Sequence, residues 1–144
     1  MSAADPTLLS MMTPFPYAIE ANATLVEARA MMDQHGIHHL PVLRDGTLAG
    51  VLSDRDLSLF MDVLADERPA LTMLVWIVCA RDPYIADIET PLAEVADRMA
   101  DLRIGSALVT EDGKLAGIIT VTDVCRGFAS LLRELGRADD DDAT

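Results

Sequence analysis

Positive charge is scarce in this chain of 144 residues, in which 11 Lys and Arg stand against 24 Asp and Glu. The resulting net charge of −13 at pH 7 argues against a nucleic-acid partner, because contacts to phosphate need a basic face. Four of the acidic residues form a run at Asp139–Asp142, which is typical of a solvated end. Apolar residues nevertheless make up 51% of the chain, so we expect a folded core.

Cysteines, leader segments and long hydrophobic runs are also few or missing. The two cysteines, Cys79 and Cys125, have apolar neighbours, which predicts core thiols in a reducing compartment rather than a disulfide framework. The chain does not open with a basic segment followed by an apolar one, so no signal peptide is expected. The most hydrophobic stretch, Leu71–Ala80, falls short of the roughly 20 residues that cross a bilayer. We therefore expect a cytoplasmic protein with no membrane partner.

What the chain does contain is a long internal repeat, found by shifting the sequence by 67 residues. The stretch GVLSDRDL, at Gly50–Leu57, then matches GIITVTDV, at Gly117–Val124. Each copy has a hydroxyl residue followed three positions later by an aspartate. The match continues without a gap to Asp45–Gly46 against Asp112–Gly113 and beyond. So long a register indicates a tandem duplication.

Each copy shows the same local pattern, which predicts the order β-α-β-β-α. The short extended pieces PYAIE and PYIAD each precede a helix with one apolar face, and Gly36 is expected to end the first of these helices. Two apolar runs around Asp-Gly then predict a β-hairpin. A final helix is predicted to begin near Asp54 and near Thr122. Helix caps are predicted at Thr24, as a capping box with Glu27, and at Thr90, with Pro91 as the first helical residue.

The predicted fold class is therefore mixed α+β, with tandem β-α-β-β-α repeats whose small mixed sheets pack about a pseudo-twofold axis. Neither copy, at about 60 residues, would bury much apolar surface alone, so we expect the two to share a core. The first domain is placed at 11–68 and the second at 69–136. Residues 1–10 and 137–144 are expected to be flexible ends.

This pattern resembles the CBS domain pair, or Bateman module, the family named after cystathionine β-synthase. The resemblance covers about residues 11–135 and rests on the two Gly-apolar-apolar-Ser/Thr-x-x-Asp motifs, each preceded by an Asp-Gly hairpin. It implies a regulatory module that binds an adenosine nucleotide (AMP, ADP or ATP) in the cleft between the repeats and signals to an unidentified effector protein. S-adenosylmethionine and NAD are other ligands of the family. Apolar residues in the two final helices favour a homodimer.

The resemblance also implies which residues contact the ligand. Asp56 and Asp123 would accept hydrogen bonds from ribose hydroxyls, and the hydroxyls that precede them would bind phosphate. Adenine would lie between the strand after the proline and the first strand of the hairpin. The ligand-binding residues implied in this way are Tyr17, Ala18, Ile19, His39, Leu40, Pro41, Ser53, Arg55, Asp56, Tyr84, Ile85, Ala86, Ser106, Ala107, Thr120, Thr122 and Asp123.

The two copies differ at one charged position of this set. Arg55 precedes Asp56 and can pair with phosphate through two N–H groups, whereas the second copy has Thr122 there. Because the chain is strongly acidic, each phosphate has to overcome a repulsive field. We therefore expect one cleft to bind phosphorylated nucleotide better than the other.

Other interpretations stay open at this point. An aspartate near a helix start stabilises the helix without any ligand, and empty clefts would leave a structural interaction module. The segment His35–His39, HGIHH, suggests a metal, but no carboxylate or thiol stands at a matching spacing, so no metal is expected. The motifs of known catalytic sites are missing, so an enzyme such as a nucleotide hydrolase is not expected, nor is a catalytic cofactor.

Overall fold

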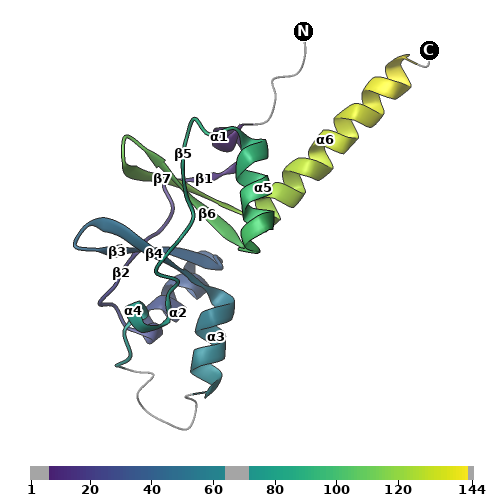
Figure 1. Ribbon diagram of the computed structural model, residues 1–144. Helices are drawn as coiled ribbons and strands as arrows, with labels where there is room; N and C mark the ends of the chain where they lie inside the picture. Colours follow the sequence, from purple (N-terminus) through teal and green to yellow (C-terminus); the bar gives the residue numbers. More distant parts are fainter. Residues whose placement is uncertain (1–6, 64–71, 143–144) are drawn as a thin grey trace. The chain divides into compact units, whose positions relative to one another are not determined.

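Figure 1 shows the computed structural model of the chain, which describes residues 7–63 and 72–142. The chain divides into two compact units. We call Phe15–Tyr84 the first-repeat unit, and Met1–Pro14 together with Ile85–Thr144 the second-repeat unit. Each unit has helices packed on a small sheet with both parallel and antiparallel strand pairs, so the predicted α+β class is confirmed.

The first-repeat unit is built on a three-stranded sheet in the order β2-β3-β4. Strand β2 is parallel to β3, and β3 is antiparallel to β4. Its core is apolar, with Leu25, Leu40 and Leu57 completely buried. The elements of this unit are β2 (Ile19–Glu20), α2 (Leu25–His35), β3 (His39–Arg44), β4 (Thr47–Ser53), α3 (Asp54–Val63) and α4 (Val75–Val78).

The second-repeat unit has a four-stranded sheet in the order β1-β7-β6-β5. Strand β5 is parallel to β6, while β6 and β1 are both antiparallel to β7. Leu8, Val95 and Ile119 are among its completely buried residues, or nearly so. The elements are α1 (Leu8–Met11), β1 (Thr13–Pro14), β5 (Ile85–Asp87), α5 (Leu92–Leu102), β6 (Ser106–Glu111), β7 (Lys114–Thr120) and α6 (Val121–Asp142).

The segment that begins each sequence repeat adds to the sheet of the other repeat. Thr13 pairs with Ile118 on β7, and at the equivalent positions Ala80 bridges to Val51 on β4. Each compact unit therefore contains the leading segment of the other sequence repeat. The domain limits expected from the sequence, 11–68 and 69–136, follow the repeat and stay a prediction.

Both hairpins turn at the predicted Asp-Gly pairs. The φ angles are 52° and 78° at Asp45 and Gly46, and 52° and 76° at Asp112 and Gly113. Positive φ at both central positions gives a turn whose twist matches that of the flanking strands. The Asp-Gly hairpin prediction is confirmed in both repeats.

The helix ends follow the sequence in the first repeat but not in the second. Thr24 Oγ1 accepts the Glu27 N–H at 3.2 Å and a Glu27 carboxylate oxygen accepts the Thr24 N–H at 3.0 Å, so the capping box is confirmed. Gly36 ends α2 in the left-handed region, as predicted. The cap predicted at Thr90 is wrong: Pro91 is the N-cap residue and makes no side-chain hydrogen bond, because its ring offers no acceptor.

Residues 1–10 and 137–144 are predicted from the sequence to be flexible ends. In the structure, α1 begins within the first range and α6 continues to Asp142 in the second. On α6, Cys125 is exposed, so its assignment to the core is wrong; an apolar sequence neighbourhood does not fix the side of a helix that a residue occupies. Cys79 is buried as expected, and that burial raises the pKa of its thiol. Within the described ranges, the structure has no helix both long and apolar enough to cross a membrane.

Candidate functional site

The ligand contacts predicted for the first repeat gather at one edge of its unit, where β3 begins and β4 ends. His39 at the start of β3 is the register partner of Ser53 at the end of β4, and α3 starts at the next residue. Because β2 runs parallel to β3, Tyr17 and Ala18 lie just before β2 on this same edge. The predicted set therefore comes from three segments that meet in space.

The second-repeat unit repeats this arrangement. Ser106 pairs with Thr120, α6 starts directly afterwards, and Ile85 on β5 pairs with its parallel neighbour β6. Several residues of the predicted set have buried side chains, so a ligand could reach them only through their backbone groups. These buried residues are Ile19, Leu40, Pro41, Ala86, Ser106 and Ala107.

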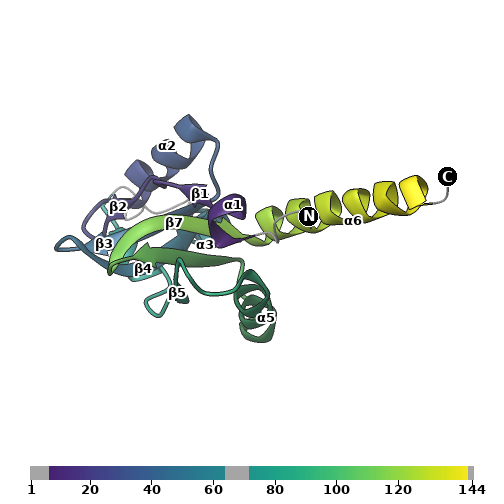
Figure 2. The same ribbon diagram turned by 90° about the horizontal axis from the view of Figure 1, so that it is seen from above.

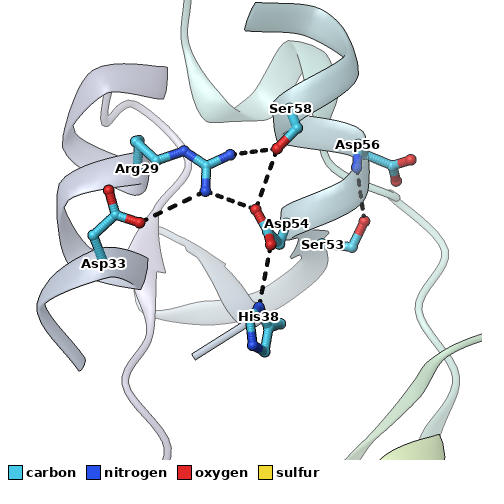
Figure 3. A network of polar contacts seen from close by, with 7 residues as sticks. All are labelled: Arg29, Asp33, His38, Ser53, Asp54, Asp56 and Ser58. Carbon is cyan, nitrogen blue, oxygen red and sulfur yellow. Dashed lines mark hydrogen bonds and ion pairs between the residues drawn. The ribbon is translucent and has the colours of Figure 1, made fainter. Parts of the chain in front are cut away.

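At the start of α3, the serine caps the helix while the aspartate of the motif stays free. Ser53 Oγ accepts the Asp56 N–H at 3.1 Å. The Asp56 carboxylate is exposed and has no hydrogen-bond or ion-pair partner among the described residues, and Figure 3 shows it pointing away from its neighbours. Arg55 beside it is exposed as well. This edge of the first repeat thus offers one guanidinium and one carboxylate without a partner among the described residues, while the Asp54 and Asp56 N–H groups already donate to the His38 carbonyl and to Ser53 Oγ.

At the start of α6, the same motif is closed on itself. Asp123 Oδ2 accepts the Thr120 N–H at 2.9 Å and the Thr120 hydroxyl at 3.0 Å. Thr120 Oγ1 in turn accepts the Asp123 N–H at 3.2 Å. In the second repeat the aspartate is therefore a helix-capping residue, the interpretation that the sequence had left open for both copies.

A polar network next to the first motif was not found from the sequence (Figure 3). Arg29 on α2 binds Asp54 at 2.6 Å through Nη1 and donates to Ser58 Oγ at 2.6 Å through Nη2. His38 Nδ1 lies 3.1 Å from the other carboxylate oxygen of Asp54, and Arg29 also lies 3.8 Å from Asp33. The Arg29 hydrogen bond, followed by that of His38, lowers the pKa of Asp54 below its usual 3.8. The network ties α2 to α3 and to the loop before β3.

His38 and His35, two histidines of HGIHH, contact different partners. His38 contacts Asp54, while His35 stacks on Tyr17 with ring centroids 3.6 Å apart and planes 11° apart. The two rings are thus engaged with different partners. No group of three or more potential metal ligands occurs within residues 7–63 and 72–142.

Comparison with known proteins places these motifs in one family. The family model described as CBS domain matches residues 8–62 and 77–130. The chain is 28% identical to the CBS domain-containing protein YhcV of Bacillus subtilis, covering 78% of this chain and 79% of YhcV. It is 26% identical to the L-aspartate semialdehyde sulfurtransferase of Methanocaldococcus jannaschii over 78% of this chain, but spans only about a fifth of that enzyme.

A solved structure agrees in fold. The crystal structure of CBSX2 in complex with AMP superposes with a TM-score of 0.71 at 25% identity, covering 87% of this chain and 97% of CBSX2. The fold and the two matched ranges thus agree with the tandem repeat deduced from the sequence.

Proposed function

The chain belongs to the CBS domain family, as a pair of such domains, and from this premise we propose that it binds an adenosine nucleotide (AMP, ADP or ATP) between its repeats and thereby regulates a partner protein. CBS pairs are generally regulatory modules, and in some larger enzymes they are side modules. The similarity to CBSX2, which was crystallised with AMP, supports an adenosine ligand. We further propose that the protein is cytoplasmic and homodimeric, has no catalytic activity, and acts on a separate effector.

The observation that carries the proposal is the free carboxylate of Asp56 beside Arg55 at the start of α3. A carboxylate accepts hydrogen bonds from both hydroxyls of a ribose, and a guanidinium binds phosphate through two N–H groups. The positive end of the α3 helix dipole also favours a phosphate, although the Asp54 and Asp56 N–H groups already have acceptors within the chain. A ribose joined to phosphate, as in AMP, therefore matches the groups present.

The second repeat is proposed to hold its ligand more weakly. Asp123 Oδ2 already accepts two hydrogen bonds from Thr120, so a ribose would have only Oδ1 to itself unless the helix cap opened. Thr122 supplies no charge where the first repeat has Arg55. We expect the first-repeat site to dominate nucleotide affinity.

Thermal unfolding against AMP, ADP, ATP, NAD and S-adenosylmethionine tests the proposal. A ligand present at a hundred times its Kd stabilises the fold by about 2.7 kcal/mol, which moves the melting temperature by several degrees. We expect this shift for an adenosine nucleotide with the native chain, a loss of it in Asp56→Asn, and a smaller change in Asp123→Asn.

The matched control is Asp33→Asn, which removes an exposed carboxylate from the same unit and should leave the ligand shift intact. The proposal fails if none of the five compounds moves the melting curve and native mass spectrometry finds no nucleotide retained through purification. The chain would then be an interaction module without a ligand.

A further inference from the structure

A stack of two rings lies at the edge of the first-repeat unit where β3 begins and β4 ends. The phenol ring of Tyr17 and the imidazole ring of His35 are face to face, with centroids 3.6 Å apart and planes 11° apart. Tyr17 belongs to the ligand-binding set implied by the family resemblance, whereas His35 does not. The stack therefore joins a proposed ligand contact to a residue of α2 that has no assigned role.

The backbone holds His35 close to this edge. His35 is the last residue of α2, and only residues 36–38 separate it from β3; Figure 2 shows α2 beside β2 and β3. The short connection is itself tied to the start of α3. The His38 carbonyl accepts the Asp54 N–H at 2.7 Å, and His38 Nδ1 lies 3.1 Å from Asp54 Oδ2. The imidazole ring thus reaches Tyr17 from a loop with little freedom to move.

Tyr17 keeps ring surface to which a second ring can bind. Its side chain remains 52% exposed although His35, itself half-buried, covers one face of the ring. An aromatic ring in this situation is a surface on which a nucleobase stacks, a contact that strengthens binding by roughly fivefold to a hundredfold. Because the stack already restricts the rotation of the Tyr17 side chain, a ligand that binds there costs the chain less conformational entropy.

The second repeat has an aliphatic side chain where the first has the imidazole. The residues 67 positions later are Tyr84 and Leu102, so the tyrosine is kept and the histidine is replaced by a leucine that is 45% exposed. A leucine side chain cannot form a parallel stack of rings. The Tyr17–His35 stack is therefore a feature of the repeat that also carries the exposed Arg55 and Asp56.

We propose that His35 is a positioning residue of the first-repeat site, which holds the Tyr17 ring so that its other face stacks on the base of the nucleotide. His35 does not touch the ligand, while Asp56 and Arg55 bind the ribose and the phosphate. The stack makes the first repeat selective for a large aromatic base. This inference rests on the proposed function and adds to it the residue that supports recognition of the base.

Titration calorimetry with AMP, ADP and ATP measures the contribution of the stack to the Kd. Tyr17→Leu should raise the Kd about tenfold and His35→Leu, which installs the residue of the second repeat, about fivefold. His35→Phe keeps a ring at this position and should stay within about twofold of the native Kd. The matched control is Gln34→Leu, which replaces the exposed neighbour of His35 on α2 and should bind like the native chain.

Nuclear magnetic resonance separates this positioning role from a general structural one. In the saturated native complex, the adenine H2 and H8 protons should show nuclear Overhauser contacts to the Tyr17 ring and an upfield ring-current shift. Both signals should weaken in His35→Leu and persist in His35→Phe. Circular-dichroism spectra of the free variants should match that of the native chain, since these side chains are exposed or half-buried.

Each outcome decides between the inference and the proposed function. A Kd that is unchanged in His35→Leu, or raised equally in His35→Leu and His35→Phe, overturns the role of His35 and leaves nucleotide binding standing. Adenine contacts to other residues in place of Tyr17 have the same meaning. A native chain that binds none of the three nucleotides removes the proposed function and this inference with it.

Discussion

The two repeats share one backbone pattern but differ in what lies between their two main helices. Between α2 and α3, Arg29 and Asp54 form a 2.6 Å ion pair; the equivalent Ala96 and Val121 leave an apolar hollow between α5 and α6. A duplicated unit can thus keep its fold while one copy fills the space between its two main helices with an ion pair and the other leaves that space open. The first copy gains internal polar contacts, and the second gains an apolar surface.

The helix-start motifs diverge in a second way. The Asp56 carboxylate has no partner among residues 7–63 and 72–142, whereas Oδ2 of the Asp123 carboxylate caps its own helix. The first carboxylate is available to a ligand through both oxygens, and the second has one oxygen engaged in the helix cap. Most of the predictions that follow use a pair of equivalent positions, so that one repeat serves as the control for the other.

The largest difference is expected at the glycines that open the two motifs. A Cβ at Gly50 would lie 2.6 Å from the backbone oxygen of Ala80, which accepts the Val51 N–H, whereas the nearest atoms to a Cβ at Gly117 belong to the flexible side chain of Met12. We expect Gly50→Ala to lower the free energy of unfolding by about 3 kcal/mol and Gly117→Ala by about 1 kcal/mol, because a methionine can move and the paired backbone cannot.

Urea unfolding followed by circular dichroism measures the free energy of unfolding of both variants. Equal losses at the two positions would mean that the leading segments of the two repeats are held with the same rigidity.

The next largest effect concerns the Arg29–Asp54 pair. Removing either partner with Arg29→Ala or Asp54→Ala should destabilise the first repeat, and a double-mutant cycle should give a coupling free energy of about 1 kcal/mol, near the upper end for partly exposed pairs. The equivalent cycle with Ala96→Gly and Val121→Ala should show little coupling. Chemical unfolding of the four chains in each cycle gives the result, and a coupling near zero for the ion pair would contradict it.

The same pair should make the first repeat sensitive to acid. Because Arg29 holds the pKa of Asp54 below its usual 3.8, the charged form is favoured by folding. The contribution of the charged Asp54 to the free energy of unfolding is complete above its usual pKa. It is lost as the pH falls through the lowered pKa of the folded state. The stability difference between the native chain and Asp54→Asn should therefore shrink as the pH falls below 4. A difference that stays constant down to pH 3 would exclude this role for Asp54.

A smaller effect is expected where α2 and α5 end. Both C-caps are left-handed, with φ of 62° at Gly36 and 54° at Arg103, but only glycine adopts this region without strain. Gly36→Ala should lower the free energy of unfolding by about 1 kcal/mol, and Arg103→Gly should raise it by up to about 1 kcal/mol. Thermal melting of the two variants should shift in opposite directions; shifts of the same sign would show that Arg103 makes compensating contacts.

The sequence predicted most of the fold because its signals are local and occur twice. Asp-Gly pairs, the Thr24–Glu27 box and Gly36 determine turns and helix ends within a few residues of themselves, and all are confirmed. The polar network was missed because Arg29 and Asp54 are 25 positions apart and meet only when α2 packs beside α3. Cys125 was misplaced for a related reason, since the exposed side of a long helix depends on what the rest of the fold covers.

The smallest predicted effect concerns the aspartates of the two motifs in the absence of ligand. Asp123 accepts two hydrogen bonds from the N-cap residue Thr120, so Asp123→Asn should weaken the start of α6 and lower the free energy of unfolding by about 0.5–1 kcal/mol. Asp56 accepts none from the described residues, so Asp56→Asn should be close to neutral, or slightly stabilising in so acidic a chain. Hydrogen exchange of the first amides of α3 and α6 reports each helix start separately. Faster exchange in α6 for Asp123→Asn, with unchanged exchange in α3 for Asp56→Asn, would establish that one repeat keeps its carboxylate free while the other uses it to hold the helix.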